Sequence, residues 1–189
     1  MNNDRIEQIL ENGRICRENM VCPGPQGPTG PTGPIGPGNT NVVAYGGIYN
    51  SAVQLVFFTA VNDYLQVKLT NPLPSLNITP NNSTLTISET GDYEITYNIL
   101  VSTSQAVDIG VAVRNNGTVI PVTRGTQTLS LDSATNISYD GRLSAITIVS
   151  LTSGDILDLA VQVINNLPTG LDAIINNNAN ATLTVRKLN

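Results

Sequence analysis

The sequence predicts an all-β head, a β-sandwich or jelly roll, preceded by a collagen-like stalk and a short N-terminal segment. Two observations support this fold class. In residues 39–189, apolar and polar side chains alternate in runs that are separated by turn-forming residues. In residues 24–37, glycine recurs at every third position and proline follows each glycine. We therefore divide the chain into an N-terminal segment (1–22), a stalk (23–38) and a head (39–189).

The N-terminal segment is interpreted as an anchoring or oligomerising segment. Ile6, Ile9 and Leu10 recur at helical spacing, which predicts a short helix with an apolar stripe. A helix of this length is marginal alone in water, so the stripe needs a partner, and the alternative is a frayed tail. The first residues do not lead into an apolar run, so we expect synthesis without a cleaved secretory signal.

The only two cysteines of the chain, Cys16 and Cys22, lie just before the first glycine triplet. Their spacing does not match that of a zinc knuckle, and the chain has no histidine to complete a metal site. In a trimer their thiols would meet at one end of the stalk, where interchain disulfides would stabilise the assembly. Attachment to another protein and free thiols are the alternatives.

The glycine repeat of the stalk predicts a triple helix, and therefore a homotrimer. Its in-phase glycines are Gly24, Gly27, Gly30, Gly33 and Gly36. Only glycine fits at the crowded axis of three wound chains, and proline favours the polyproline II conformation that each chain adopts. A triple helix of this length spans roughly 40 Å at about 3 Å per residue. So short a stalk needs another element to hold the three chains together.

The head is predicted to contain about eight to ten short strands. Apolar residues alternate with polar ones at 93–101, 107–113, 157–163 and 183–185, and turn residues such as Asn-Gly separate the runs. This regular spacing of strands and turns favours a sandwich or jelly roll over any α/β fold.

One predicted strand, 143–151, is apolar on both of its faces. Ala145 and Val149 fall on one side, and Ile146 and Ile148 fall on the other. In a two-layer fold, a strand that needs cover on both faces predicts a subunit interface. The alternative is a central strand in an unusually thick core.

The composition argues against several classes of function. The chain has nine Lys and Arg against fourteen Asp and Glu, and its net charge of −5 is the opposite of the basic patch that nucleic-acid or anionic-membrane binding needs. No run approaches the roughly 18 apolar residues of a membrane span. Because histidine is absent, the commonest general base and metal ligand are missing. We predict no enzyme activity, cofactor, bound metal, nucleic acid or membrane insertion.

A glycine repeat followed by this β-domain resembles the collagen-like glycoproteins of bacterial spore exosporia, the Bacillus family and its clostridial relatives. Three stretches of the head carry the resemblance. Residues 90–99 are similar to the family's Gly-x-Tyr strand, 111–117 to the next strand and its Asn-Gly turn, and 151–159 to its Leu-x-x-Gly-Asp stretch. Residues 181–188 suit the closing strand. The resemblance implies a trimeric jelly-roll head of the complement and tumour-necrosis-factor type.

The resemblance also implies a function: a structural surface protein that forms homotrimeric filaments on the spore exosporium or coat, with the head outward and a role in adhesion or shielding. The second partner it implies is another coat, exosporium or appendage protein, bound through the N-terminal segment. The alternative is the receptor-binding tip of a phage or surface fibre, because such tips use the same rod-and-head design.

Residues outside the head acquire roles by the same resemblance. The apolar stripe of the N-terminal segment would supply the anchoring contact. Cys16 and Cys22 would lock that contact covalently or join the three chains to one another. Thr29 and Thr32 occupy Y positions of the repeat, where side chains point outward. Because threonine at such positions can carry O-linked sugar in the resembled family, glycosylation is implied here.

Overall fold

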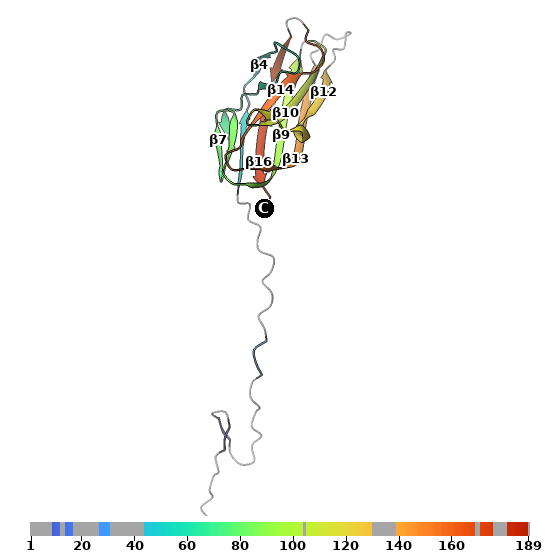
Figure 1. Cartoon of the computed structure of the whole chain (residues 1–189). Helices are drawn as coiled ribbons and strands as arrows, with labels where there is room; N and C mark the ends of the chain where they lie inside the picture. Colours follow the sequence, from blue (N-terminus) through green and yellow to red (C-terminus); the bar gives the residue numbers. More distant parts are fainter. Residues whose placement is uncertain are drawn as a thin grey trace, which may run out of the picture. The chain divides into compact units, whose positions relative to one another are not determined.

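The structure is a computed structural model of the whole chain (Figure 1). The chain divides into two units, Met1–Asn39 and Thr40–Asn189. The structure describes residues 9–11, 14–16, 27–30, 44–103, 105–129, 139–168, 171–175 and 181–188.

The described part of the N-terminal segment is a pair of short strands, so the helix expected there is wrong for residues 9–16. Strand β1 (Ile9–Glu11) pairs antiparallel with β2 (Arg14–Cys16), with Glu11 opposite Arg14 and Ile9 opposite Cys16. The two residues between the strands are Asn12 and Gly13. Asn-Gly is the dipeptide most favoured in two-residue hairpin loops, and a helix this short gains little in water. The local turn chemistry therefore outweighs the helical spacing.

The head consists of two antiparallel sheets. The first sheet contains, in spatial order, β3 (Tyr45–Asn50), β16 (Ala181–Lys187), β9 (Gly91–Thr103) and β13 (Tyr139–Leu151). The second contains, in spatial order, β8 (Thr84–Ile87), β14 (Ile156–Val163), β10 (Val107–Asn115) and β12 (Gly125–Leu129).

The order of these strands makes the head a jelly roll. Counted along the chain from the first to the eighth, the main strands lie in the order first, eighth, third, sixth in one sheet and second, seventh, fourth, fifth in the other. Except for β10 and β12, partners that are adjacent in a sheet are thus not consecutive main strands of the chain, as in the two interleaved Greek keys of a jelly roll. The predicted fold class of the head is confirmed.

Shorter elements extend and close the two sheets. In the first sheet β4 pairs with β15 and β6 with β3, and in the second β5 pairs with β14, β7 with β8 and β11 with β10. Their bounds are β4 (Gln54–Phe57), β5 (Leu65–Gln66), β6 (Asn71–Pro72), β7 (Ile78–Asn81), β11 (Thr118–Val119) and β15 (Asp172–Ile175). A 3-10 turn (Pro121–Thr123) follows β11. In Figure 1, β4 lies at the end of the head opposite the C-terminus.

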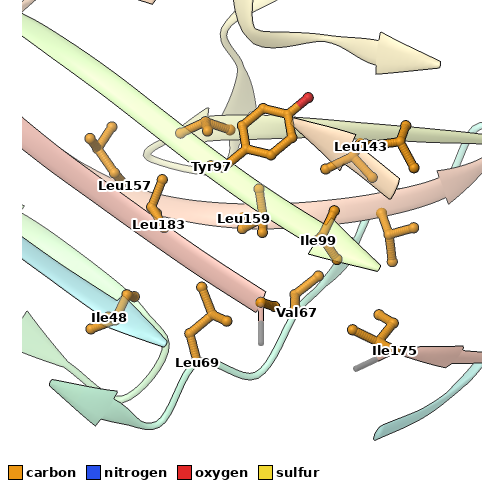
Figure 2. Close-up of a cluster of buried hydrophobic side chains, with 14 of the residues drawn as sticks. Ile48, Val67, Leu69, Tyr97, Ile99, Leu143, Leu157, Leu159, Ile175 and Leu183 are labelled. Atoms are coloured by element: carbon orange, nitrogen blue, oxygen red, sulfur yellow. The ribbon is translucent and has the colours of Figure 1, made fainter. Parts of the chain in front are cut away.

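The core lies between the two sheets, and alternate residues of the central strands face it. Every second residue of β9 from Tyr93 to Val101 is buried, as are Leu157, Leu159 and Val161 of β14. Figure 2 shows Tyr97 and Ile99 of β9 together with Leu183 of β16 and Leu159 of β14. These core residues confirm the strands predicted at 93–101 and 157–163. The residues between them are buried as well toward the C-terminal ends of both strands, at Leu100, Ala160 and Gln162.

The predicted Asn-Gly turn after β10 is also confirmed. Asn116 and Gly117 have φ angles of 50° and 80°, and Asn115 pairs directly with Thr118. Two successive left-handed residues are what a two-residue type I′ hairpin requires, and asparagine and glycine adopt that conformation most easily. Asp155 closes the neighbouring turn by accepting a hydrogen bond from the Thr152 backbone N–H at 2.8 Å.

Candidate functional site

The candidate functional surface is the outer face of the first sheet, and its most exposed side chains belong to β13. Ile146 and Ile148 are 71% and 60% exposed. They alternate with Ala145, Thr147 and Val149, which turn toward the core. The apolar outer side of β13 is therefore not packed inside the head, and the alternative of a central strand in a thick core is wrong.

β13 is also the edge strand of the first sheet. Within the described residues it pairs with β9 alone, through all thirteen of its residues. Near Gly141 it packs against Leu129 and Gln127 of β12, whereas its inward residues Ala145, Thr147 and Val149 are only half-buried. An apolar edge strand with exposed side chains is a surface onto which another chain can pack.

The strands beside β13 continue the surface with uncharged groups. Ile146 stands opposite Thr96 of β9, and Thr96 stands opposite Thr184 of β16. The next row begins with Ile148 and contains Glu94 and Arg186, which pair with each other at 3.1 Å between Arg186 Nε and Glu94 Oε1. The two charges offset each other, so this part of the face carries apolar and neutral polar groups with no excess charge.

The same face is apolar at its far end. Leu55 and Phe57 of β4 are both exposed, whereas Val56 between them packs against the core. Leu55 stands opposite Ile174 of β15, and Ile174 stands opposite Ser102 of β9. Because directly opposed residues in a sheet point to the same side, Leu55 and Phe57 lie on the same side of the sheet as Ile146. Leu100 and Ser102 of β9, which lie between them on that side, are buried. We call Leu55, Phe57, Ile146 and Ile148 the apolar face.

The outer side of the second sheet has a different character. Its centre is formed by Ala112 and Ala160, which are fully buried, and by the ion pair between Arg114 and Asp158. Hydrogen bonding to the Asp158 carboxylate raises the pKa of Arg114 above its already high ordinary value. Ile156 is the exposed isoleucine on this side. The two sheets thus present one face suited to apolar contact and one face closed by a charge pair.

No family model and no curated protein matches the sequence. Among solved structures, the chain is similar to murine APRIL at pH 5.0, with 14% identity and a TM-score of 0.49 over 77% of this chain and 98% of that one. It is also similar to Eiger TNF from S. frugiperda, with 18% identity and a TM-score of 0.49 over 77% of this chain and 91% of that one. The assignment of the head as a jelly roll rests on its strand order.

The described residues offer little chemistry beyond this surface. They contain no group of three or more acidic, histidine or cysteine side chains that could hold a metal ion. None of the helices in the described ranges is long and apolar enough to cross a membrane. A shallow groove of about 340 Å³ lies beside the Glu94–Arg186 pair, lined also by Tyr45, Leu73 and Pro74.

Of the predicted stalk residues, Gly27, Thr29 and Gly30 lie in the described residues 27–30. All of 27–30 is exposed and outside any helix or strand. An added Cβ at Gly27 or Gly30 would meet no atom within 4 Å. The other residues predicted for the stalk lie outside the described ranges, and they are Gly24, Thr32, Gly33 and Gly36.

Of the predicted anchoring residues, Ile9 and Leu10 lie on β1 and Cys16 ends β2. Ile6 and Cys22 lie outside the described ranges. These residues belong to the unit Met1–Asn39, and the apolar face belongs to the unit Thr40–Asn189. Sequence reasoning found Ile146 and Ile148 through the two-sided pattern, but missed Leu55 and Phe57. The alternation of Gln54 to Phe57 was the available signal.

Proposed function

We propose that the chain is a structural protein that forms a homotrimer, with the apolar face and the free edge of β13 as the contact between heads. The observation that carries the proposal is the exposure of Ile146 and Ile148 on a long edge strand. Burying the apolar area of such side chains contributes about 25 cal/mol per Å².

The stalk gives evidence for an assembly of three chains, and this evidence is independent of the head. At Gly27 and Gly30 a side chain would meet nothing within the single chain, so one chain alone has no steric need for glycine there. A triple helix requires glycine at these positions, because every third residue lies at the shared axis, where only glycine fits. The repeat and the apolar face therefore favour the same assembly, with the head supplying most of the association energy.

The biological setting that we propose is the surface of a bacterial spore, with a passive role in adhesion or shielding. The support is the resemblance of the repeat and the three head stretches to the collagen-like exosporium family. The head would face outward, and the N-terminal segment would attach to a coat, exosporium or appendage protein. The absence of histidine from the chain agrees with a role that involves no acid–base chemistry.

The trimer interface is tested by substituting residues of the apolar face and measuring the molar mass of the protein in solution. The intact chain should have a trimer mass by light scattering at micromolar concentration. The double variant Ile146→Ser and Ile148→Ser should dissociate at concentrations where the unchanged chain does not. Ile156→Ser is the matched control, because it removes an exposed isoleucine from the other sheet. A monomeric unchanged chain, or equal weakening by the control, would refute the interface.

The setting is tested by immunogold labelling of sporulating cells. Labelling of the spore surface is expected, and labelling that persists on spores of a strain lacking the N-terminal segment would argue against that segment as the anchor. Labelling confined to phage particles would contradict the spore assignment and favour a fibre tip.

A further inference from the structure

Two side chains from distant parts of the chain, those of Lys187 and Asn77, meet at the carboxylate of Glu89. The Lys187 ammonium nitrogen lies 3.0 Å from Glu89 Oε2. The side-chain amide of Asn77 donates to Glu89 Oε1 at 2.9 Å. The Lys187 amine and the Asn77 carboxamide thus both contact the Glu89 carboxylate. We propose that Lys187 and Asn77 form an intramolecular amide bond, an isopeptide cross-link, and that Glu89 moves the protons.

The position of each group follows from the fold. Lys187 ends β16, where it stands opposite Tyr93 of β9 in the first sheet. Asn77 immediately precedes β7 of the second sheet, and its φ of 52° turns the chain sharply there. Glu89 lies in the connection between β8 and β9, which passes from one sheet to the other. A bond between Lys187 and Asn77 would therefore join the two sheets covalently.

The main chains that carry Glu89 and Lys187 are held in place by neighbours. The buried Tyr93 hydroxyl donates to the Glu89 backbone carbonyl at 2.8 Å, which fixes the main chain that carries the carboxylate. The Lys187 backbone N–H donates to Ala44 O at 2.8 Å, and the next N–H, that of Leu188, donates to Asp92 O. The Lys187 side chain is 12% exposed and the Glu89 side chain is 37% exposed. Groups held close to one another react far faster than the same groups free in solution.

The reaction balances without any added reactant. The Lys187 ammonium gives a proton to the Glu89 carboxylate, which leaves a neutral amine as the nucleophile. The amine lone pair attacks Asn77 Cγ and forms the new C–N bond, and the bond from Cγ to Nδ2 then breaks. The leaving nitrogen takes one proton from Glu89 and one from the attacking nitrogen, and it departs as ammonium. Glu89 regains its negative charge.

The other ion pairs in the described part of the head cannot react in this way. Arg114–Asp158 and Arg186–Glu94 both use a guanidinium, which stays protonated and is a poor nucleophile. The chain has a second lysine, Lys68, whose backbone is bridged by the Gln54 side chain. Lys68 therefore provides a matched control for the reactivity of Lys187.

The direct test is the intact mass of the purified full-length chain after incubation at neutral pH. The cross-linked chain is lighter than its sequence by one ammonia. A peptide map should contain a branched peptide that joins Asn77 to Lys187, and trypsin should fail to cut after the acylated Lys187. A full sequence mass overturns the proposal. So does an ammonia loss that maps to Asn116-Gly117, because an Asn-Gly pair can lose ammonia by closing on its own backbone.

Two variants separate the covalent bond from the ion pair. Lys187→Arg keeps the charge beside Glu89 but cannot be acylated, and Glu89→Gln removes the proton carrier, so both should have the full sequence mass. Lys68→Arg should still lose one ammonia. Because the bond closes a loop of about one hundred residues, Lys187→Arg should lower the thermal midpoint by on the order of 10 °C. If Lys187→Arg loses one ammonia as the unchanged chain does, and unfolds at the same thermal midpoint, the cross-link is refuted, whatever the oligomeric state.

Discussion

Arg114 on β10 and Asp158 on β14 form a two-point ion pair across neighbouring strands. Arg114 Nε lies 2.8 Å from Asp158 Oδ1, and its Nη2 lies 2.8 Å from Oδ2. The two side chains are 17% and 13% exposed. The third donor of the guanidinium, Nη1, reaches the Tyr64 carbonyl at 3.1 Å, so the pair also holds the segment that precedes β5.

The first prediction is that Arg114→Lys destabilises the head although it keeps the charge. A lysine offers a single ammonium and cannot reproduce the two parallel hydrogen bonds, so the free energy of unfolding should fall by about 1–2 kcal/mol. Urea denaturation measures this change. The control is Arg186→Lys at the more exposed pair with Glu94, where we expect about 0.5 kcal/mol or less. Equal effects at both sites would contradict the role given to Arg114.

The second prediction contrasts two buried tyrosines of β9. The Tyr93 hydroxyl donates to Glu89 O at 2.8 Å, whereas the buried Tyr97 hydroxyl lies beside the Gly125 backbone and donates to no acceptor. Tyr93→Phe should therefore lower the free energy of unfolding by about 1 kcal/mol. Tyr97→Phe removes a buried hydroxyl whose proton has no acceptor, so the free energy of unfolding should fall less than in Tyr93→Phe. Chemical denaturation of both variants measures the contrast, and a larger loss for Tyr97→Phe would refute it.

The third prediction concerns alkaline pH. Burial raises the pKa of Tyr97 from 10.0 to about 12. The unfolded chain therefore releases this proton at a lower pH than the folded chain does. The stability that Tyr97 contributes is complete below pH 10, and it declines by about 2–3 kcal/mol as the pH rises to about 12. Denaturation curves between pH 9 and pH 12 should show the decline, and Tyr97→Phe should flatten that part of the profile.

The fourth prediction is that the head assembles without the stalk. Deleting residues 1–38 removes the glycine repeat but retains the apolar face. The stalk offers mostly solvated polyproline II surface, whereas three heads can bury Leu55, Phe57, Ile146 and Ile148 against one another. Light scattering should give a trimer mass for the truncated chain. If the truncated chain is a monomer at micromolar concentration, the N-terminal unit, and not the head, drives the assembly.

The fifth prediction is that residues 1–22 are sufficient for attachment. A fusion of this segment to a fluorescent protein should be recruited to the spore surface, and changing Ile6, Ile9 and Leu10 to serine should weaken recruitment because it removes the apolar contact. Diffuse fluorescence of the unchanged fusion would exclude the segment as a sufficient anchor.

On non-reducing gels, trimer-sized bands would indicate that Cys16 and Cys22 join the three chains, and larger species would indicate a bond to another protein.

The sequence alone was enough to predict the features that depend on the local spacing of apolar, polar and turn-forming residues. A period of two predicted the strands of β9 and β14, since successive side chains of a strand point to opposite faces of the sheet. The Asn-Gly pair after β10 predicted its turn, and the two apolar sides of β13 predicted the apolar side chains that are exposed there. The helical spacing of Ile9 and Leu10 failed because three apolar residues in a short segment fit more than one period, and the Asn12-Gly13 pair favours a hairpin.

Only the tertiary structure decided which distant residues meet. The jelly-roll order places β16 beside β9 and β14 beside β10, and no local pattern encodes such pairings. Arg114 thereby reaches Asp158, and Lys187 reaches Glu89, ninety-eight residues earlier in the chain. Leu55 was indistinguishable from a core leucine until the register of β4 on β15 turned it outward. The physical reason is that alternation specifies that a strand has two faces, whereas the packing of the two sheets determines which face is covered.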